Sequence, residues 1–102
     1  MNIGIDIVEC DRVANLVSDK IFSAEELDYI QQKNGALPTV AGLFAAKEAY
    51  FKAKGSGIIK SELPKVAIGH HANGQPYYLN DAQAALSISH TATTAVAVCM
   101  IF

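Results

Sequence analysis

Two carboxylates occupy positions at which the periodicity of the sequence predicts apolar side chains, and Glu48 is the first of them. It lies in a stretch of good helix formers, where it shares one side of the expected helix with Phe44 and Phe51 at spacings of i, i+4 and i+7. A carboxylate held in an apolar face must be neutralised, paired or bound to a metal ion. Lys52, one turn later, is one partner for Glu48 in an ordinary surface ion pair, and a metal ion is another.

Asp6 is the second such carboxylate. Residues 2–9 alternate as a strand does, with Ile3, Ile5 and Ile7 on one face and Gly4, Asp6 and Val8 on the other. Aspartate is disfavoured within strands, so Asp6 is either a functional residue or a solvent-facing side chain on a half-buried strand. If Asp6 and Glu48 meet in space, the pair suits a hard cation that also binds phosphate oxygens, which is how Mg²⁺ is usually held.

Other polar residues could also carry chemistry. Lys47, Lys52 and Lys54 cluster on the same expected helix, where they could meet phosphates as point charges or form a solvated face. Ser89 and His90 end a buried strand, where a histidine is either a ligand-binding or a structural residue. No segment matches a P-loop, and no serine, histidine and aspartate spacing matches a hydrolase motif.

The elements that position these residues follow from periodicity and from capping and turn signals. We expect a strand over 2–9, a short helix over 11–18, a second helix opened by the capping box of Ser23 and Glu26, and a long helix from near Pro38 to Gly55. Further along we expect a strand over 65–71, a hairpin turn at Asn73-Gly74, a one- or two-turn helix ending at Leu86, and strands over 87–90 and 95–102. The fold class is therefore α+β, a mostly antiparallel sheet packed on one long helix.

Composition limits the class of protein. A chain of 102 residues, just over half of them apolar, suits a single domain over 1–102 with one core. A net charge of −2 argues against a nucleic-acid binder, and no apolar run reaches transmembrane length. Met1 leads straight into a strand pattern rather than a signal peptide, so neither membrane contact nor export is expected. Cys10 and Cys99 have no metal spacing, and we interpret them as reduced core cysteines of a cytoplasmic protein.

Several motifs in fixed order resemble those of one family. They are Gly4-Ile-Asp6-Ile-Val-Glu9 followed by Arg12, Phe22-Ser-Ala-Glu-Glu-Leu27, Phe44-Ala-Ala-Lys-Glu-Ala49 with Lys52-Ala53, Gly55-Ser-Gly57-Ile58, Asn73-Gly-Gln-Pro76 and Ser87-Ile-Ser-His90. The sequence resembles the holo-(acyl carrier protein) synthases, the small 4′-phosphopantetheinyl transferases. The resemblance runs nearly end to end and implies the fold of that family.

The resemblance also implies a reaction. The 4′-phosphopantetheine group of coenzyme A would pass to a serine of apo acyl carrier protein, leaving adenosine 3′,5′-bisphosphate. Asp6 and Glu48 would hold Mg²⁺, Lys52 would act on the leaving phosphate, and Arg12 would contact the carrier. The base stays open between a metal-bound water and Glu48. The residues expected to bind coenzyme A are Lys47, Gly55, Gly57, Asn73, Gly74, Pro76, Ser89 and His90.

The expected assembly is a homotrimer. Residues 95–102 are apolar on both faces, which a half-exposed sheet would not allow, so burial against copies of the chain is expected. The resemblance supplies the number three and a coenzyme A site in the cleft between subunits. Two departures stand out: Leu43 replaces an arginine common in the family, and the segment from Arg12 to Phe22 is short. The alternative is a non-catalytic relative that binds coenzyme A or a carrier protein.

Overall fold

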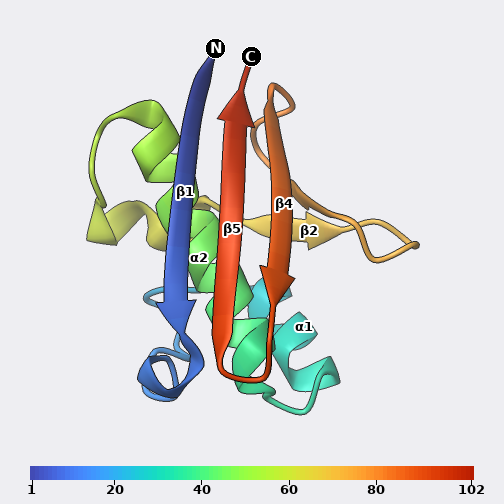
Figure 1. Cartoon of the computed structure of the whole chain (residues 1–102). Helices are drawn as coiled ribbons and strands as arrows, with labels where there is room; N and C mark the ends of the chain where they lie inside the picture. The colour runs from blue at the N-terminus through green and yellow to red at the C-terminus, as the bar shows by residue number, and fades with distance from the viewer.

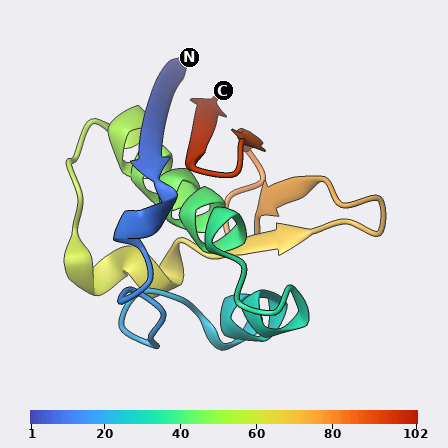
Figure 2. The ribbon, with the colours of Figure 1, turned by 60° about the horizontal axis from the view of Figure 1, so that its bottom comes forward.

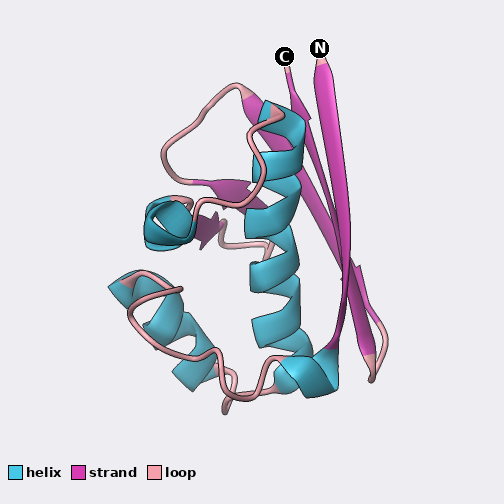
Figure 3. Ribbon diagram, turned by 90° about the vertical axis from the view of Figure 1, so that its left-hand side faces the viewer, coloured by secondary structure: helices cyan, strands magenta, loops and turns pink.

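A three-stranded antiparallel sheet lies against one long helix in this computed structural model, which describes residues 1–102 (Figure 1). The sheet consists of β1 (Asn2–Glu9), β4 (Ala84–His90) and β5 (Thr94–Ile101), with β5 between the other two. The helix α2 (Leu37–Lys54) packs on one face of this sheet, and the sheet's other face carries no helix (Figure 3). The expected α+β class is confirmed.

The remaining elements lie on the helix side of the sheet (Figures 2 and 3). They are the short 3₁₀ helix η1 (Cys10–Arg12), α1 (Ala24–Gln32), the 3₁₀ helix η2 (Lys60–Lys65) and the hairpin of β2 (Ile68–His70) with β3 (Pro76–Tyr78). The hairpin turn contains Gly74 at a φ of 91°, a backbone conformation that glycine adopts without strain, as the Asn73-Gly74 signal predicts. None of the helices combines the length and the apolar character that a membrane crossing requires.

The alternation of β1 is observed as predicted. Ile3, Ile5 and Ile7 are more than 60% exposed on the open face of the sheet, whereas Asp6 and Val8 face α2. Gly4 lets the strand approach the helix backbone, because a Cβ at this position would lie 2.1 Å from the Ala49 carbonyl oxygen. This close approach brings β1 beside the C-terminal half of α2.

The ends of α2 also follow the sequence signals. Pro38 occupies the first turn, where its missing N–H is not needed, and Gly55 ends the helix in the left-handed conformation at a φ of 72°. The helix is buried on several sides, since Ala45, Ala49 and Phe51 are all at most 4% exposed. It therefore forms the centre of the core between the sheet and the α1–hairpin layer.

Three expected elements differ from the structure. The helix over 11–18 is reduced to η1, because valine, asparagine and serine have low helix propensity. The helix ending at Leu86 does not form: Asp81 instead accepts a hydrogen bond from the Gln83 amide in a turn, and β4 begins at Ala84, which pairs with Ile101. The strand over 65–71 is shortened to β2 because η2 extends to Lys65.

Candidate active site

Asp6 and Lys52 form the first contact of the site. The Asp6 side chain is buried, and its Oδ1 accepts a hydrogen bond of 2.9 Å from Lys52 Nζ, which also donates to the Ile5 carbonyl oxygen at 3.1 Å. Lys52 thus pairs across to the strand, and the surface pair with Glu48 considered from helical spacing is not formed. The solvent-facing alternative for Asp6 is wrong, because Gly4 draws this face of β1 onto the helix.

Glu48 lies beside Asp6, as the two-carboxylate hypothesis requires. Partial burial is the largest cause that raises the pKa of Glu48 from 4.5 to about 7, and the neighbouring Asp6 carboxyl contributes to the same rise. Lys52 and Arg12 act in the opposite direction, since a nearby cation favours the ionised carboxylate. Two carboxyls from separate elements therefore share a small volume in which their negative charges repel.

The donor set fits a magnesium ion. Asp6 Oδ2 is buried and has no hydrogen-bond partner, which leaves one oxygen beside Glu48 free to bind a cation. No group of three or more histidine, cysteine, aspartate and glutamate side chains is gathered anywhere in the chain. Two carboxylates are still enough for Mg²⁺, which keeps several water ligands and takes others from substrate phosphates.

A cavity of about 730 Å³ opens beside Glu48. It lies between α2, η2 and the segment before α1, and its lining includes Leu16, Ile21, Phe44, Leu63 and Pro64. Lys20 and Lys60 contribute the cationic side chains of the lining. A smaller hollow of about 140 Å³ joins Glu48 to Arg12 at the end of β1. The carboxylate site thus adjoins an apolar cavity whose lining includes lysines.

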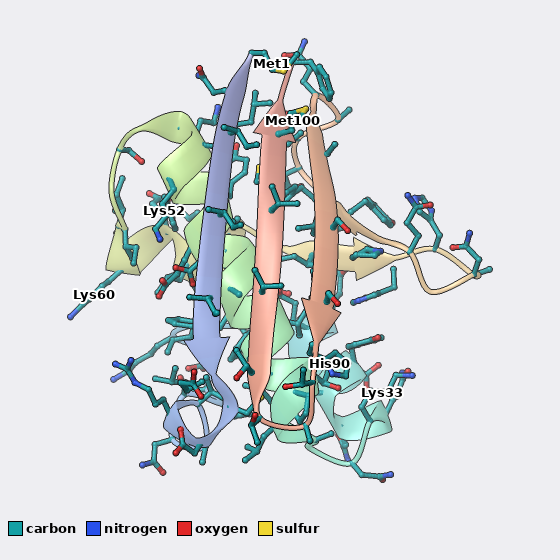
Figure 4. All side chains as sticks on the ribbon, in the orientation of Figure 1. Met1, Lys33, Lys52, Lys60, His90 and Met100 are labelled. Atoms are coloured by element: carbon teal, nitrogen blue, oxygen red, sulfur yellow. The ribbon has the colours of Figure 1, made fainter.

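The second group of predicted residues lies on the other side of α2. His90 ends β4, at the opposite sheet edge from β1, and Figure 4 places it far from Lys52. Together with Gly74, Pro76 and Leu43 it lines a hollow of about 180 Å³. Because α2 stands between the two groups, one chain alone does not bring His90 to the carboxylates.

The other predicted coenzyme A residues are distributed around both groups. Gly55 and Gly57 are exposed just past the C-terminus of α2, one turn beyond Lys52. Asn73 is exposed in the hairpin turn, where its side chain accepts a hydrogen bond from the Gln75 amide. Ser89 is exposed on the sheet face away from α2 and does not line the hollow at His90.

Lys47 does not have the predicted role. Its side chain is fully buried, and its ammonium group bonds to Glu26, so it does not reach a phosphate in solvent. Burial lowers the pKa of Lys47, and the Glu26 carboxylate partly offsets this effect. Lys54 also stands apart, with its ammonium 3.9 Å from Asp81. The sequence did not reveal Glu26 as the partner of Lys47, because the capping box with Ser23 already explained why a glutamate occupies this position.

The chain is similar in sequence to a known family of proteins. The family model described as the 4′-phosphopantetheinyl transferase superfamily matches residues 2–99. A holo-[acyl-carrier-protein] synthase of Treponema denticola is 37% identical over 99% of this chain and 97% of its own length.

Two solved structures are also similar in fold. The synthase of Bacillus anthracis in complex with CoA (3′,5′-ADP) has a TM-score of 0.85 at 35% identity, covering 98% of this chain and 94% of its own. The synthase of Helicobacter pylori in complex with coenzyme A has a TM-score of 0.80 at 30% identity, covering 98% and 99% of the two chains.

Proposed function

The chain belongs to the holo-[acyl-carrier-protein] synthases of the 4′-phosphopantetheinyl transferase superfamily, and we propose that it transfers 4′-phosphopantetheine from coenzyme A to a serine of apo acyl carrier protein. The products are holo carrier protein and adenosine 3′,5′-bisphosphate. The single observation that supports this proposal most directly is the Asp6, Glu48 and Lys52 constellation: two crowded carboxyls, a free buried oxygen and a lysine within hydrogen-bonding distance.

In this proposal Asp6 and Glu48 hold Mg²⁺ against the pyrophosphate of coenzyme A. Bound there, the ion would neutralise charge on the phosphate oxygens and orient the in-line attack. The chain's own contribution is to fix both carboxylates through the backbone contact of Gly4 with α2. Asp6 Oδ2 is available for the ion because Lys52 occupies only Oδ1.

Lys52 is assigned to the leaving phosphate. Its ammonium is anchored by the Asp6 carboxylate and the Ile5 carbonyl oxygen, yet its side chain remains about half exposed, at 52%. A half-exposed ammonium beside the carboxylates can donate a hydrogen bond or a proton to the departing adenosine bisphosphate. Coenzyme A would then also pass the exposed backbone at Gly55 and Gly57, next to this lysine.

The proton of the attacking serine needs an acceptor. Glu48, with a pKa of about 7, is partly ionised at neutral pH in the absence of metal, which suits a general base. With Mg²⁺ bound, the ionised Glu48 carboxylate would be a ligand instead, and the ion would supply a water molecule of lowered pKa as the alternative base. Both choices keep Glu48 essential for the transfer.

A homotrimer with shared sites completes the proposal. The open face of the sheet carries Ile3, Ile5 and Ile7, each more than 60% exposed, which is a larger apolar row than a monomer of this size usually leaves in water. His90 and the Asn73–Pro76 turn lie on the far side of α2 from Asp6. A neighbouring subunit would supply them to the carboxylate site, with the hollow at His90 receiving another part of coenzyme A.

Arg12 is assigned to the carrier protein. It lies at the end of η1, is exposed, and adjoins Glu48 across the small hollow. Acyl carrier proteins are acidic and the chain itself has a net charge of −2, so local cations must steer the encounter. Both cysteines, Cys10 and Cys99, are buried free thiols, which supports a cytoplasmic location.

The transfer itself is tested directly. Purified protein is incubated with apo acyl carrier protein, coenzyme A and Mg²⁺, and the carrier is weighed by mass spectrometry. We expect the mass of one phosphopantetheine group to be added, and expect the addition to stop when the metal is chelated. A carrier of unchanged mass, with coenzyme A bound to the protein in calorimetry, would favour the non-catalytic alternative.

A further inference from the structure

The buried ion pair of Lys47 and Glu26 lies outside the chemistry described so far. Both side chains are fully buried, and Lys47 Nζ lies 2.6 Å from Glu26 Oε1. The two residues are 21 positions apart, on α2 and on the first turn of α1. Ion pairs in such surroundings are rare, because both groups lose their hydration.

Every hydrogen-bonding position of the ammonium group is used. Besides Glu26, Lys47 Nζ donates to the carbonyl oxygens of Leu63 and Val66, each at 2.9 Å. Glu26 is equally committed: Oε1 also accepts from the Ser23 amide at 2.9 Å, and Oε2 accepts from the Ile68 amide at 3.2 Å. Neither side chain has a hydrogen-bonding position left for a substrate, so the pair acts only through the structure of the protein.

The pair joins four segments. It holds α2 to the start of α1, to the end of η2 and to the start of β2. Two of these contacts lie at the active site. Lys47 directly precedes Glu48, and the Leu63 carbonyl belongs to η2, whose residues Lys60, Ser61, Leu63 and Pro64 line the 730 Å³ cavity beside Glu48.

Stability alone does not account for this pair. Replacing a buried ion pair with apolar side chains of similar volume is often neutral or stabilising. Hydrogen bonds in three directions from one ammonium group, however, fix orientation in a way that apolar contacts do not. The directed bonds of Lys47 set the position of η2 relative to α2, and therefore the distance from Glu48 to the facing cavity wall.

We propose that Lys47 and Glu26 are positioning residues, which keep the η2 wall of the cavity at a fixed distance from Glu48 for the transfer reaction. The inference rests on the proposed function in so far as Glu48 and this cavity form the reaction site. The pair touches neither coenzyme A nor the carrier, and acts through Glu48 and through η2.

The test replaces both charges together. In the double variant Glu26→Met and Lys47→Met, no unpaired charge remains buried, but the Ile68 amide loses its acceptor, so we expect a folded protein with a lower melting temperature than the unmodified chain. We expect its kcat per folded molecule to fall about 10- to 100-fold, because small displacements of reacting groups are costly. We also expect KM for the carrier to change. The matched control removes the exposed pair Glu62 and Lys65 of the same η2 segment, 3.6 Å apart, and should leave both constants unchanged.

The outcomes separate positioning from a purely structural role. If the pair had a purely structural role, the double variant would contain less folded protein, but KM and the rate per folded molecule would not change. A folded double variant with unmodified kcat and KM would overturn the proposal. If the double variant does not fold, Glu26→Gln is tested instead. The glutamine side chain keeps one oxygen to accept from Lys47 and places its NH₂ group against the Ile68 N–H, where two donors meet. Unchanged kcat and KM in that variant would also overturn the proposal.

A second measurement uses the unmodified protein. The Ile68 amide donates to a buried carboxylate, so its hydrogen exchange should be as slow as that of the α2 core, and rapid exchange would overturn the proposal. If the unmodified protein transfers nothing, the proposed function has failed. The positioning role is then judged by exchange at Ile68 and by coenzyme A affinity in calorimetry, which should fall in the double variant and stay constant in the Glu62 and Lys65 control.

Discussion

Replacing Glu48 with glutamine removes one of the two carboxyls that crowd beside α2, so stability and activity should move in opposite directions. The pKa of about 7 means that folded protein keeps a proton on Glu48 that the unfolded chain loses near 4.5. Stability of the unmodified protein therefore falls as the pH rises from about 4.5 to 7. The Glu48→Gln variant has no carboxyl at this position, so its stability does not fall in this way.

The expected size follows from the two pKa values. The difference between 4.5 and about 7 corresponds to at most roughly 3.4 kcal/mol. Because the Glu48 carboxyl is partly exposed to solvent, we expect about 1–2 kcal/mol. The variant should thus be more stable than the unmodified protein by that amount at pH 8, and equally stable at pH 4. The transfer rate should be at least about a hundredfold lower, because one of the two charges proposed to hold Mg²⁺ is lost.

Thermal unfolding with a metal chelator present, at fixed protein concentration, measures the stability difference at both pH values. The control is Glu25→Gln, which removes an exposed carboxylate from α1. Added Mg²⁺ should raise the melting temperature of the unmodified protein at pH 8 and not that of Glu48→Gln. A stability gain of the same size at pH 4 and pH 8 would refute the raised pKa, and near-normal turnover would refute the metal-ligand role.

Other variants test the remaining assignments. Arg12→Ala should raise KM for the carrier about tenfold, more at low salt, with little change for coenzyme A, and equal effects on both substrates in steady-state kinetics would contradict this. Light scattering should give three times the monomer mass, and Ile5→Asp should lower it to the monomer value; an active monomer would end the trimer proposal. Inactive Asp6→Ala and His90→Ala proteins, unfolded and refolded together, should regain activity, and trimers without activity would show that His90 does not complete a neighbour's site. Gly4→Ala should destabilise the fold by about 3 kcal/mol or more in denaturant titration, because its Cβ meets the Ala49 carbonyl; a smaller loss would show that the strand can move away from α2.

Much of the site could be predicted from the sequence because local rules are broken there. A mid-strand Asp6 and a helical Glu48 in an apolar face each contradict propensity or pattern, and such contradictions gather at functional sites. The elements that carry them obey strong local signals, namely β1 alternation, Pro38 and Gly55. Local and tertiary preferences agree in these segments, so the predicted boundaries lie close to the observed ones.

Two of the failed predictions share a different cause. The bond between Lys47 and Glu26 joins residues 21 positions apart, and no local pattern distinguishes a lysine on a buried helix side from one in solvent. The segment from Asp81 to Leu86 has residues compatible with a helix, but pairing of Ala84 with Ile101 stabilises a strand instead. Long-range partners decide both cases, and only the folded chain shows them.

The exposed row of Ile3, Ile5 and Ile7 has a consequence for the stability of a chain outside the proposed trimer. These side chains lie on β1, an outer strand of the sheet, so the exposed apolar row lies next to a strand edge with unpaired backbone groups. A chain separated from its neighbours would offer both features at once to any similar chain. We expect heating to cause aggregation rather than reversible unfolding, so that the protein's working lifetime is set by a rate of loss.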